Sequence, residues 1–248
     1  MIDLTMPRFH FPVPLTPGKH ELTSALAHHA QHVLRLRVGD ALILFDGAGQ
    51  EADAQVVAYS DRSMQVEISH VSVLSRETPL KVSLLQALPS GDKMDWIVEK
   101  CTELGVHAIQ PIQAARSVVR LDSARAAKKQ VRWQQIASAA CAQCGRNLIP
   151  ELSPVLSLNE ALLSRPHNEL RLLLDLAPKA TRLSQLDWPQ NLTELSILVG
   201  PEGAFTDSEI SAACAAGFIP INLGARILRT ETAGLACLAA LNVLHGDF

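Results

Sequence analysis

The pattern of hydrophobic and polar residues along the chain changes in character near residue 75. Before that point, apolar residues run or alternate in short stretches at 41–45, 52–59 and 64–71. Alternation with a period of two is typical of half-buried strands, and the turn signal Asp46-Gly47 closes the first stretch. One helix is expected at about 24–34. We therefore predict that residues 1–74 form a compact β domain, a small barrel with one helix.

Beyond the polar stretch that ends at Pro79, strand and helix patterns alternate. Strands that are mostly apolar are predicted at 82–88, 109–112, 170–174, 195–199 and 218–223. Helices are predicted at 93–104, 123–144, 206–216 and 231–244. Mostly apolar strands with helices between them indicate a parallel sheet covered on both faces. Residues 75–248 are therefore expected to form a separate α/β domain.

Composition narrows the class of protein. The chain has 248 residues, 48% of them hydrophobic, and a formal net charge of −3, which excludes a disordered chain and a uniformly basic surface but not a local basic patch. The chain has five cysteines, an odd number and few for its length, so a disulfide framework is not expected. The apolar run 234–244 is far shorter than the roughly 20 residues of a membrane span, and Asp3 and Pro7 do not fit a secretory signal. We expect a cytoplasmic protein that does not enter a membrane.

Two loops at the carboxyl ends of predicted strands carry candidate chemistry, because ligands of open α/β sheets bind at this edge. The first is the segment 198–205, in which Gly200 and Gly203 allow close approach of the backbone and Pro201 stiffens the turn. A capping box, Thr206-x-x-Glu209, opens the next helix. The loop offers backbone groups to a ligand, but the glycines alone fit a tight connection between strand and helix equally well.

The second loop, 223–233, is unusual for a plain connection. Between a strand that ends at Gly224 and a helix that begins near Thr230, it contains two arginines, Arg226 and Arg229, with two aliphatic residues between them. As a binding loop it would bring cations to the strand ends. The alternative is that the arginines are surface charges and that the aliphatic residues are a packing staple.

These two loops carry a resemblance to a known family. The segments LVGPEGAF-T-x-x-E and LGARILRTETA, in this order near the carboxyl terminus, resemble the SPOUT superfamily of methyltransferases, and within it the bacterial 16S rRNA uridine-N3 methyltransferases (the RsmE family). Segments 6–9, 32–40 and 44–47 resemble the PUA-like domain of that family, and segments 91–95, 103–106 and 140–146 the start of its catalytic domain. One departure is Ala204, where the family often has a further glycine.

The resemblance implies a fold, a cofactor and an assembly. The carboxyl-terminal domain is expected to be a SPOUT-type knotted α/β domain with a trefoil knot, which holds S-adenosylmethionine in a bent shape and dimerises as a homodimer. By analogy the cofactor-binding residues are Leu174, Leu198, Val199, Gly200, Pro201, Glu202, Gly203, Leu223, Gly224, Ile227, Leu228, Thr230, Thr232 and Ala233.

The reaction that the resemblance implies needs a proton to leave uridine N3, after which an arginine can stabilise the anion that develops. The charged residues of the two loops, Glu202, Arg229 and Glu231, are the catalytic candidates. The sequence does not rank base against stabiliser. For Glu231, the alternative is a carboxylate that complements the dipole of the helix that it begins.

The resemblance implies that the partner is 16S rRNA within the 30S subunit, and local charge indicates where this RNA would bind. The segment 116–146 contains seven basic residues and one acid, Asp122. Four of the basic residues share one face of the predicted helix, although such runs are more often only a solvated surface. The RNA-binding candidates from this segment, the first domain and the 91–95 motif are Arg8, Arg35, Arg37, Lys93, Arg116, Arg125, Lys128, Lys129, Arg132 and Arg146.

Other interpretations remain in view. Cys141-x-x-Cys144 has redox or zinc spacing, and His28 and His32 are a possible metal pair, but neither has further ligands nearby in the sequence, so no metal is expected. Rival functions are a knotted 2′-O-ribose methyltransferase that acts on rRNA or tRNA, and an RNA-binding or ribosome-assembly module without catalytic activity.

Overall fold

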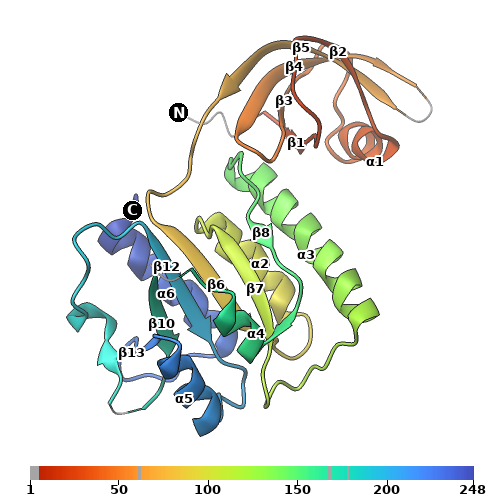
Figure 1. Ribbon diagram of the computed structural model, residues 1–248. Helices are drawn as coiled ribbons and strands as arrows, with labels where there is room; N and C mark the ends of the chain where they lie inside the picture. The colour runs from red at the N-terminus through yellow and green to blue at the C-terminus, as the bar shows by residue number, and fades with distance from the viewer. Residues whose placement is uncertain (1–5, 61–62, 167–168, 178) are drawn as a thin grey trace. The chain divides into compact units, whose positions relative to one another are not determined.

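The computed structural model describes residues 6–60, 63–166, 169–177 and 179–248. These residues fold into two compact units (Figure 1). The first runs to Glu77 and also takes in Ser138–Ile149, whereas the second comprises Thr78–Ala137 and Pro150–Phe248. The last turns of the long helix α3 (Ser123–Cys144) therefore belong to the first unit.

The first unit is built on a sheet that, in the described part of the chain, has five strands. They are β1 (Arg8–His10), β2 (Gly18–Leu22), β3 (Ala41–Phe45), β4 (Gln50–Tyr59) and β5 (Met64–Val73). Their order is β1-β3-β4-β5-β2, and every pairing is antiparallel except that of β1 with β3. The three expected strands are confirmed. The two short strands β1 and β2 were not predicted, because they contain too few apolar residues to form a pattern.

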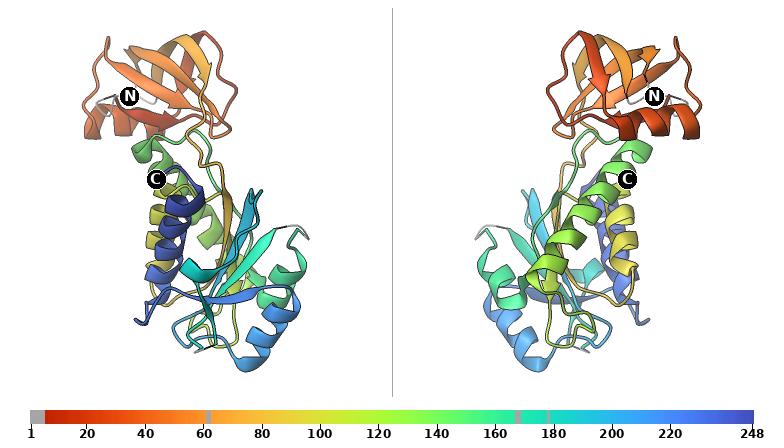
Figure 2. Two further views of the ribbon diagram at one scale, coloured as in Figure 1. Left: turned by 90° about the vertical axis from the view of Figure 1, so that its left-hand side faces the viewer. Right: turned by 90° about the vertical axis from the view of Figure 1, so that its right-hand side faces the viewer.

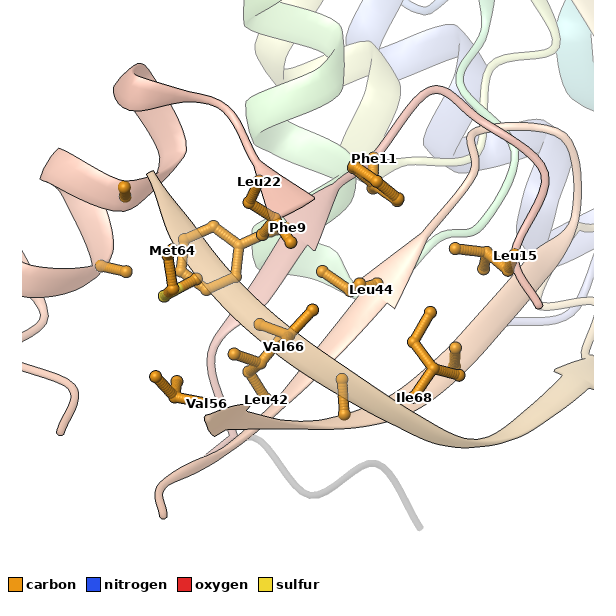
Figure 3. Packing of buried hydrophobic residues seen from close by; sticks show 14 residues of the cluster. Phe9, Phe11, Leu15, Leu22, Leu42, Leu44, Val56, Met64, Val66 and Ile68 are labelled. Atoms are coloured by element: carbon orange, nitrogen blue, oxygen red, sulfur yellow. The ribbon is translucent and has the colours of Figure 1, made fainter. Parts of the chain in front are cut away.

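Alternation along the strands forms the core of this unit. On β5, Met64, Val66 and Ile68 are buried, while Gln65 and Glu67 between them are exposed. The buried side chains meet Phe9, Phe11 and leucines from the other strands in one cluster (Figure 3).

The single helix expected at 24–34 is instead two pieces, α1 (Ser24–His28) and a π-helical turn, η1 (His29–Val33). The amide of Leu34 donates to the carbonyl oxygen of His29 five residues earlier, at 3.1 Å, which is the bond pattern of a π-helix.

The second unit contains a sheet of eight strands within the described residues, all paired in parallel, as the apolar strands predicted. The strands are β6 (Lys81–Ala87), β7 (Ala108–Gln113), β8 (Glu151–Leu152), β9 (Leu156–Ser157), β10 (Leu170–Leu174), β11 (Thr181–Arg182), β12 (Glu194–Val199) and β13 (Ile219–Asn222). The order is β11-β13-β10-β12-β6-β7-β8, with β9 also beside β7.

Helices cover both faces of this sheet (Figure 2). They are α2 (Lys93–Glu103), the first part of α3, α4 (Leu158–Leu163), α5 (Asp207–Ala215) and α6 (Thr230–His245), with a short 3₁₀ turn, η2 (Leu183–Gln185), between β11 and β12. Helices α2 and α6 pack side by side on one face, and α4 and α5 lie on the other. Adjacent residues of β6 serve opposite faces: Leu84 lies against Gly234 of α6, whereas Leu85 belongs to the cluster beneath α4 and α5.

Two local features position the loops at the carboxyl edge of this sheet. The capping box is confirmed: the amide of Glu209 donates to the Thr206 hydroxyl at 3.2 Å, and the amide of Thr206 donates to the Glu209 carboxylate at 2.8 Å. At Gly234, a Cβ atom would lie 3.2 Å from Leu84, so the glycine lets α6 approach the sheet closely. No helix in the parts of the chain that the structure describes is long and apolar enough to cross a membrane.

Candidate active site

A pocket of about 390 Å³ opens at the carboxyl edge of the second unit's sheet. It is formed by the ends of β10, β12 and β13 together with the loops that follow them. Parallel strands bring these three loops to the same edge, and the volume lies within the range of small-molecule sites. The two loops that the sequence singled out are therefore neighbours in space.

Most of the predicted cofactor-binding residues line this pocket. They are Leu174, Val199, Gly200, Pro201, Glu202, Leu223, Gly224, Ile227, Leu228, Thr230 and Ala233. Three predicted residues are not part of its wall: Leu198 is buried in the core, Gly203 lies against Arg116, and Thr232 is exposed on α6. Sequence reasoning did not name Asp175, Phe205 and Ile210, which also line the pocket. Phe205 ends the glycine-rich segment itself, whereas Asp175 and Ile210 belong to no motif.

The loop after β12 has a conformation that its residues dictate. A Cβ atom on Gly200 would come within 3.2 Å of the buried ring of Phe205, so a larger residue would displace that ring from the pocket wall. Ala204 has a φ of +56°, in the left-handed region that glycine adopts most easily. A glycine would adopt this turn without strain, whereas Ala204 adopts it at some cost.

Buried hydrogen bonds tie the two loops together. The Thr230 hydroxyl donates to the Gly200 carbonyl oxygen at 2.6 Å, and the Gln86 amide nitrogen, at the end of β6, donates to the Thr230 hydroxyl at 3.0 Å. Gln86 and Thr230 are both buried. The start of α6 is thereby fixed against the loop after β12.

Charges of alternating sign follow one side of the pocket. The Lys93 ammonium lies 2.9 Å from Oε1 of Glu202 and 3.4 Å from Oε2 of Glu231. Arg229 continues the row, with its guanidinium 4.0 Å from Oε1 of Glu231. The three catalytic candidates therefore lie together, joined by a lysine that the sequence had suggested only as an RNA contact.

Glu202 is held ionised. Burial alone would raise the pKa of its carboxyl group, but hydrogen bonds from the hydroxyl and amide of Ser90 and from Lys93 outweigh burial and lower the pKa to about 2. A carboxylate with so low a pKa is a poor acceptor for a proton.

The RNA-binding candidates divide into exposed and paired side chains. Arg35, Arg37, Arg116, Arg125 and Lys128 are exposed. On α3, Arg125 lies near Asp122, Lys129 lies 3.5 Å from Asp92 and Arg132 binds Asp95, which also accepts a bond from Trp133. The net positive charge of 116–146 is thus partly balanced by acids outside that segment.

Two RNA-binding candidates were wrong. The side chain of Arg8 is only 4% exposed, and its guanidinium donates to Glu51 at 3.0 Å and to Asn147 at 2.6 Å. Arg146 is also buried, where it forms an ion pair with Glu77. The side chains of these arginines lie in the interior of the first unit, where they neutralise half-buried carboxylates, so they do not present a surface to RNA.

Cys141, the first cysteine of the Cys141-x-x-Cys144 motif, is buried. Burial raises the pKa of the Cys141 thiol to about 12, so the thiol stays protonated at neutral pH. Among the described residues, no group of three or more histidine, cysteine, aspartate or glutamate side chains is arranged to hold a metal ion.

Comparison with known proteins defines the class of this fold and site. A family model described as an RNA methyltransferase domain matches residues 76–242, which contain the whole pocket, and one described as an RNA methyltransferase PUA domain matches residues 22–69. The chain therefore belongs to the RNA methyltransferases, and within them to the ribosomal RNA small subunit methyltransferase E family.

Individual relatives agree along nearly the whole chain. The ribosomal RNA small subunit methyltransferase E of Bacillus subtilis is 35% identical over 236 residues, 91% of this chain and 92% of the relative. The crystal structure of the Neisseria gonorrhoeae protein of that name, bound to S-adenosyl methionine, has a TM-score of 0.91 and 40% identity, covering 98% of this chain and 99% of the other. A methyltransferase from Legionella pneumophila in complex with the same cofactor has a TM-score of 0.92 and 36% identity over 98% of this chain and 99% of the other.

Proposed function

We propose that the protein transfers a methyl group from S-adenosylmethionine to N3 of a uridine in 16S rRNA. The observation that carries the proposal is the pocket at the carboxyl edge of the second unit's sheet, where the loop after β12 meets the row of charges that includes Glu231 and Arg229. Membership of the small subunit methyltransferase E family supports the choice of 16S rRNA. The resemblance in the two motifs supports the choice of uridine N3.

The pocket fits the proposed cofactor in its chemistry. Leucine and isoleucine side chains form apolar walls suited to a flat base, and three loops bring backbone donors and acceptors to the same space. Asp175 adds a carboxylate for a cationic group. When bound, S-adenosylmethionine supplies an already activated methyl group on a sulfonium, so the protein's task is alignment and control of one proton.

Glu231 is the better candidate of the two glutamates for accepting the proton of N3. Both carboxylates line the pocket, but Glu202 accepts hydrogen bonds from three donors of Ser90 and Lys93, whereas Glu231, on the first turn of α6, has only ion-pair contacts with Lys93 and Arg229 among the described residues. Arg229, beside it, has a side chain that is 81% exposed and can meet the negative charge that spreads over the base as the proton leaves. General-base assistance of this kind is worth on the order of 10²- to 10⁴-fold in rate.

The exposed arginines and lysines would hold the RNA through its phosphates. Arg35 and Arg37 present charge from the first unit, and Arg116 and Lys128 present it from the second. We propose residues 1–74 as the RNA-binding domain and residues 75–248 as the methyltransferase domain, acting on rRNA in the cytoplasm and within the 30S subunit.

We also propose that the carboxyl-terminal segment forms a trefoil knot and that two copies of the chain form a homodimer through this domain. The path of the chain supports the knot. In the sheet, β13 pairs with β10 on the side away from β12, whereas the next helix, α6, packs on β6 and β12. The segment that joins β13 to α6 therefore passes the ends of β10 and β12. Sedimentation of the purified protein at micromolar concentration tests the dimer.

The proposed reaction is tested with purified protein, methyl-labelled S-adenosylmethionine, and either naked 16S rRNA or 30S subunits. Mass mapping of the nucleosides should find 3-methyluridine. If the 30S subunit is the substrate, as proposed, it should take up more label than naked 16S rRNA. Label on a ribose 2′-oxygen would contradict the proposal and favour the rival methyltransferase. Absence of cofactor binding in calorimetry would favour an RNA-binding module without catalytic activity.

A further inference from the structure

Lys93 lies between two carboxylates that come from different parts of the second unit. It is the first residue of α2, Glu202 belongs to the loop after β12, and Glu231 belongs to the first turn of α6. The ammonium is 2.9 Å from Glu202 and 3.4 Å from Glu231, and the three side chains are 32%, 29% and 16% exposed. One cation thus connects three elements at the edge of the pocket.

One end of this arrangement is fixed. Oε1 of Glu202 accepts hydrogen bonds from the amide of Ser90 at 3.0 Å and from its hydroxyl at 2.7 Å, in addition to the bond from Lys93. Ser90 and Lys93 flank the turn that begins α2, so Glu202 is held against that turn. The other end, Glu231, faces the pocket and has Arg229 on its far side.

We propose that Lys93 is a positioning residue for the proposed methyl transfer: it joins the fixed Glu202 to Glu231 and so holds the Glu231 carboxylate in place at the pocket. This inference rests on the proposed function. It assigns Lys93 a role inside the site rather than on RNA, and it makes Glu202 an anchor rather than a base.

Electrostatics explains why the lysine matters. Glu202 and Glu231 approach the same ammonium, and without it the two negative charges would face each other. Like charges at this distance repel one another. Removal of the ammonium therefore turns the Glu231 side chain away from Glu202. The other charged side chains of the pocket are Asp175, Arg226 and Arg229.

The same geometry weighs against Lys93 as a phosphate contact. Its hydrogen bond to Glu202 and its ion pair with Glu231 surround one positive charge with two negative ones. A phosphate approaching this ammonium would meet a net negative environment, unlike the one that it meets at the exposed Lys128.

The test compares Lys93→Met, which removes the charge, with Lys93→Arg, which keeps it. Lys81→Met is the matched control, because Lys81 is exposed on β6 and pairs with Glu194 away from the pocket. In steady-state methylation of 16S rRNA, Lys93→Met should lower kcat by at least about tenfold and change the KM for rRNA by less than about twofold. Lys93→Arg should recover most of the rate. A rise in KM with unchanged kcat would overturn the proposal in favour of an RNA contact.

A second measurement does not depend on catalysis. Carbon NMR of glutamate carboxyl groups, with the signal of Glu231 assigned from Glu231→Gln, reports on the surroundings of this side chain. At one fixed pH the Glu231 signal should move in Lys93→Met and return toward its wild-type position in Lys93→Arg. An unmoved signal in Lys93→Met would overturn the role of Lys93. A moved signal, together with a wild-type protein that methylates nothing, would leave the bridge standing and contradict the proposed function instead.

Discussion

The hydroxyl of Thr230 donates a hydrogen bond to the carbonyl oxygen of Gly200, 2.6 Å away, and this single bond joins the start of α6 to the loop after β12. Thr230 in turn accepts a bond from Gln86, so a strand end, a loop and a helix start meet at one hydroxyl. Gly200 and Thr230 both line the pocket. The shape of the site thus depends on a buried polar contact between segments that are 30 residues apart.

Replacing Thr230 by valine should damage both stability and cofactor binding. The substitution keeps the shape but leaves the Gly200 carbonyl without this donor and the Gln86 amide with only its bond to the Ala87 carbonyl oxygen, which costs about 1–3 kcal/mol in the free energy of unfolding. Urea denaturation measures this loss, and calorimetry should find weaker binding of S-adenosylmethionine. Thr230→Ser keeps the hydroxyl and is the control. Equal behaviour of the two variants would mean that the hydrogen bonds contribute nothing.

Replacing Arg229 by alanine should lower methylation of 30S subunits by at least about tenfold without unfolding the protein. The side chain is largely exposed, so its loss leaves the core intact, but the anion that develops on the base loses the cation that we propose stabilises it. Arg182→Ala, which removes an exposed arginine on β11, should behave as the wild type. Turnover of Arg229→Ala near the wild-type rate would rule out a catalytic role for this arginine.

Acid should destabilise the first unit through Glu51. Burial alone would raise the pKa of this carboxyl group, but hydrogen bonds from Arg76 and Arg8 outweigh burial and lower the pKa to about 2, below its ordinary value of 4.5. A carboxyl group whose pKa falls on folding stabilises the protein above its unfolded pKa, and that contribution disappears as the pH falls from about 4.5 to 2.

Thermal unfolding of Glu51→Gln tests this dependence. At pH 7 the variant should have a lower Tm than the wild type, because Arg8 and Arg76 lose their counter-charge. The difference should shrink as the pH approaches 2. Glu21→Gln, at an exposed position on β2, should change little at any pH. A constant difference across this range would show that ionisation of Glu51 does not contribute to stability.

Reversing the charge of Lys128 should weaken rRNA binding in a salt-dependent way. Lys128 is exposed on α3 and has no ion-pair partner within the described ranges, unlike Lys129, which lies near Asp92. Lys128→Glu should lower affinity and reduce the slope of log affinity against log salt concentration by about 1. Lys81→Glu makes the same charge change on an exposed part of β6. If both variants bind alike at all salt concentrations, α3 is only a solvated surface.

Local patterns predicted much of the second unit. The bounds of β10 and α3 coincide with the predicted segments, and the capping box at Thr206 fixes the start of α5, because each signal lies within a few neighbouring residues. The two candidate loops were also found from sequence, since parallel strands bring their carboxyl ends to one edge. Ranking Glu202 against Glu231 needed the structure, because Ser90 and Lys93 approach Glu202 from more than a hundred residues away.

The first unit was harder to predict for the same reason. Arginines are usually exposed, so Arg8 and Arg146 looked like RNA contacts. Their carboxylate partners, Glu51 and Glu77, are 43 and 69 residues away in sequence, and no local pattern records such pairs. The inclusion of 138–149 in this unit depends on these contacts, which is why the periodicity of α3 gave no indication of it.

The most direct test of the central claim is nucleoside analysis of 16S rRNA from a strain that lacks this protein. The account predicts that 3-methyluridine disappears from the 16S rRNA and returns when the wild-type gene, but not the Arg229→Ala variant, is supplied. Full retention of 3-methyluridine in the strain without the protein would contradict the account.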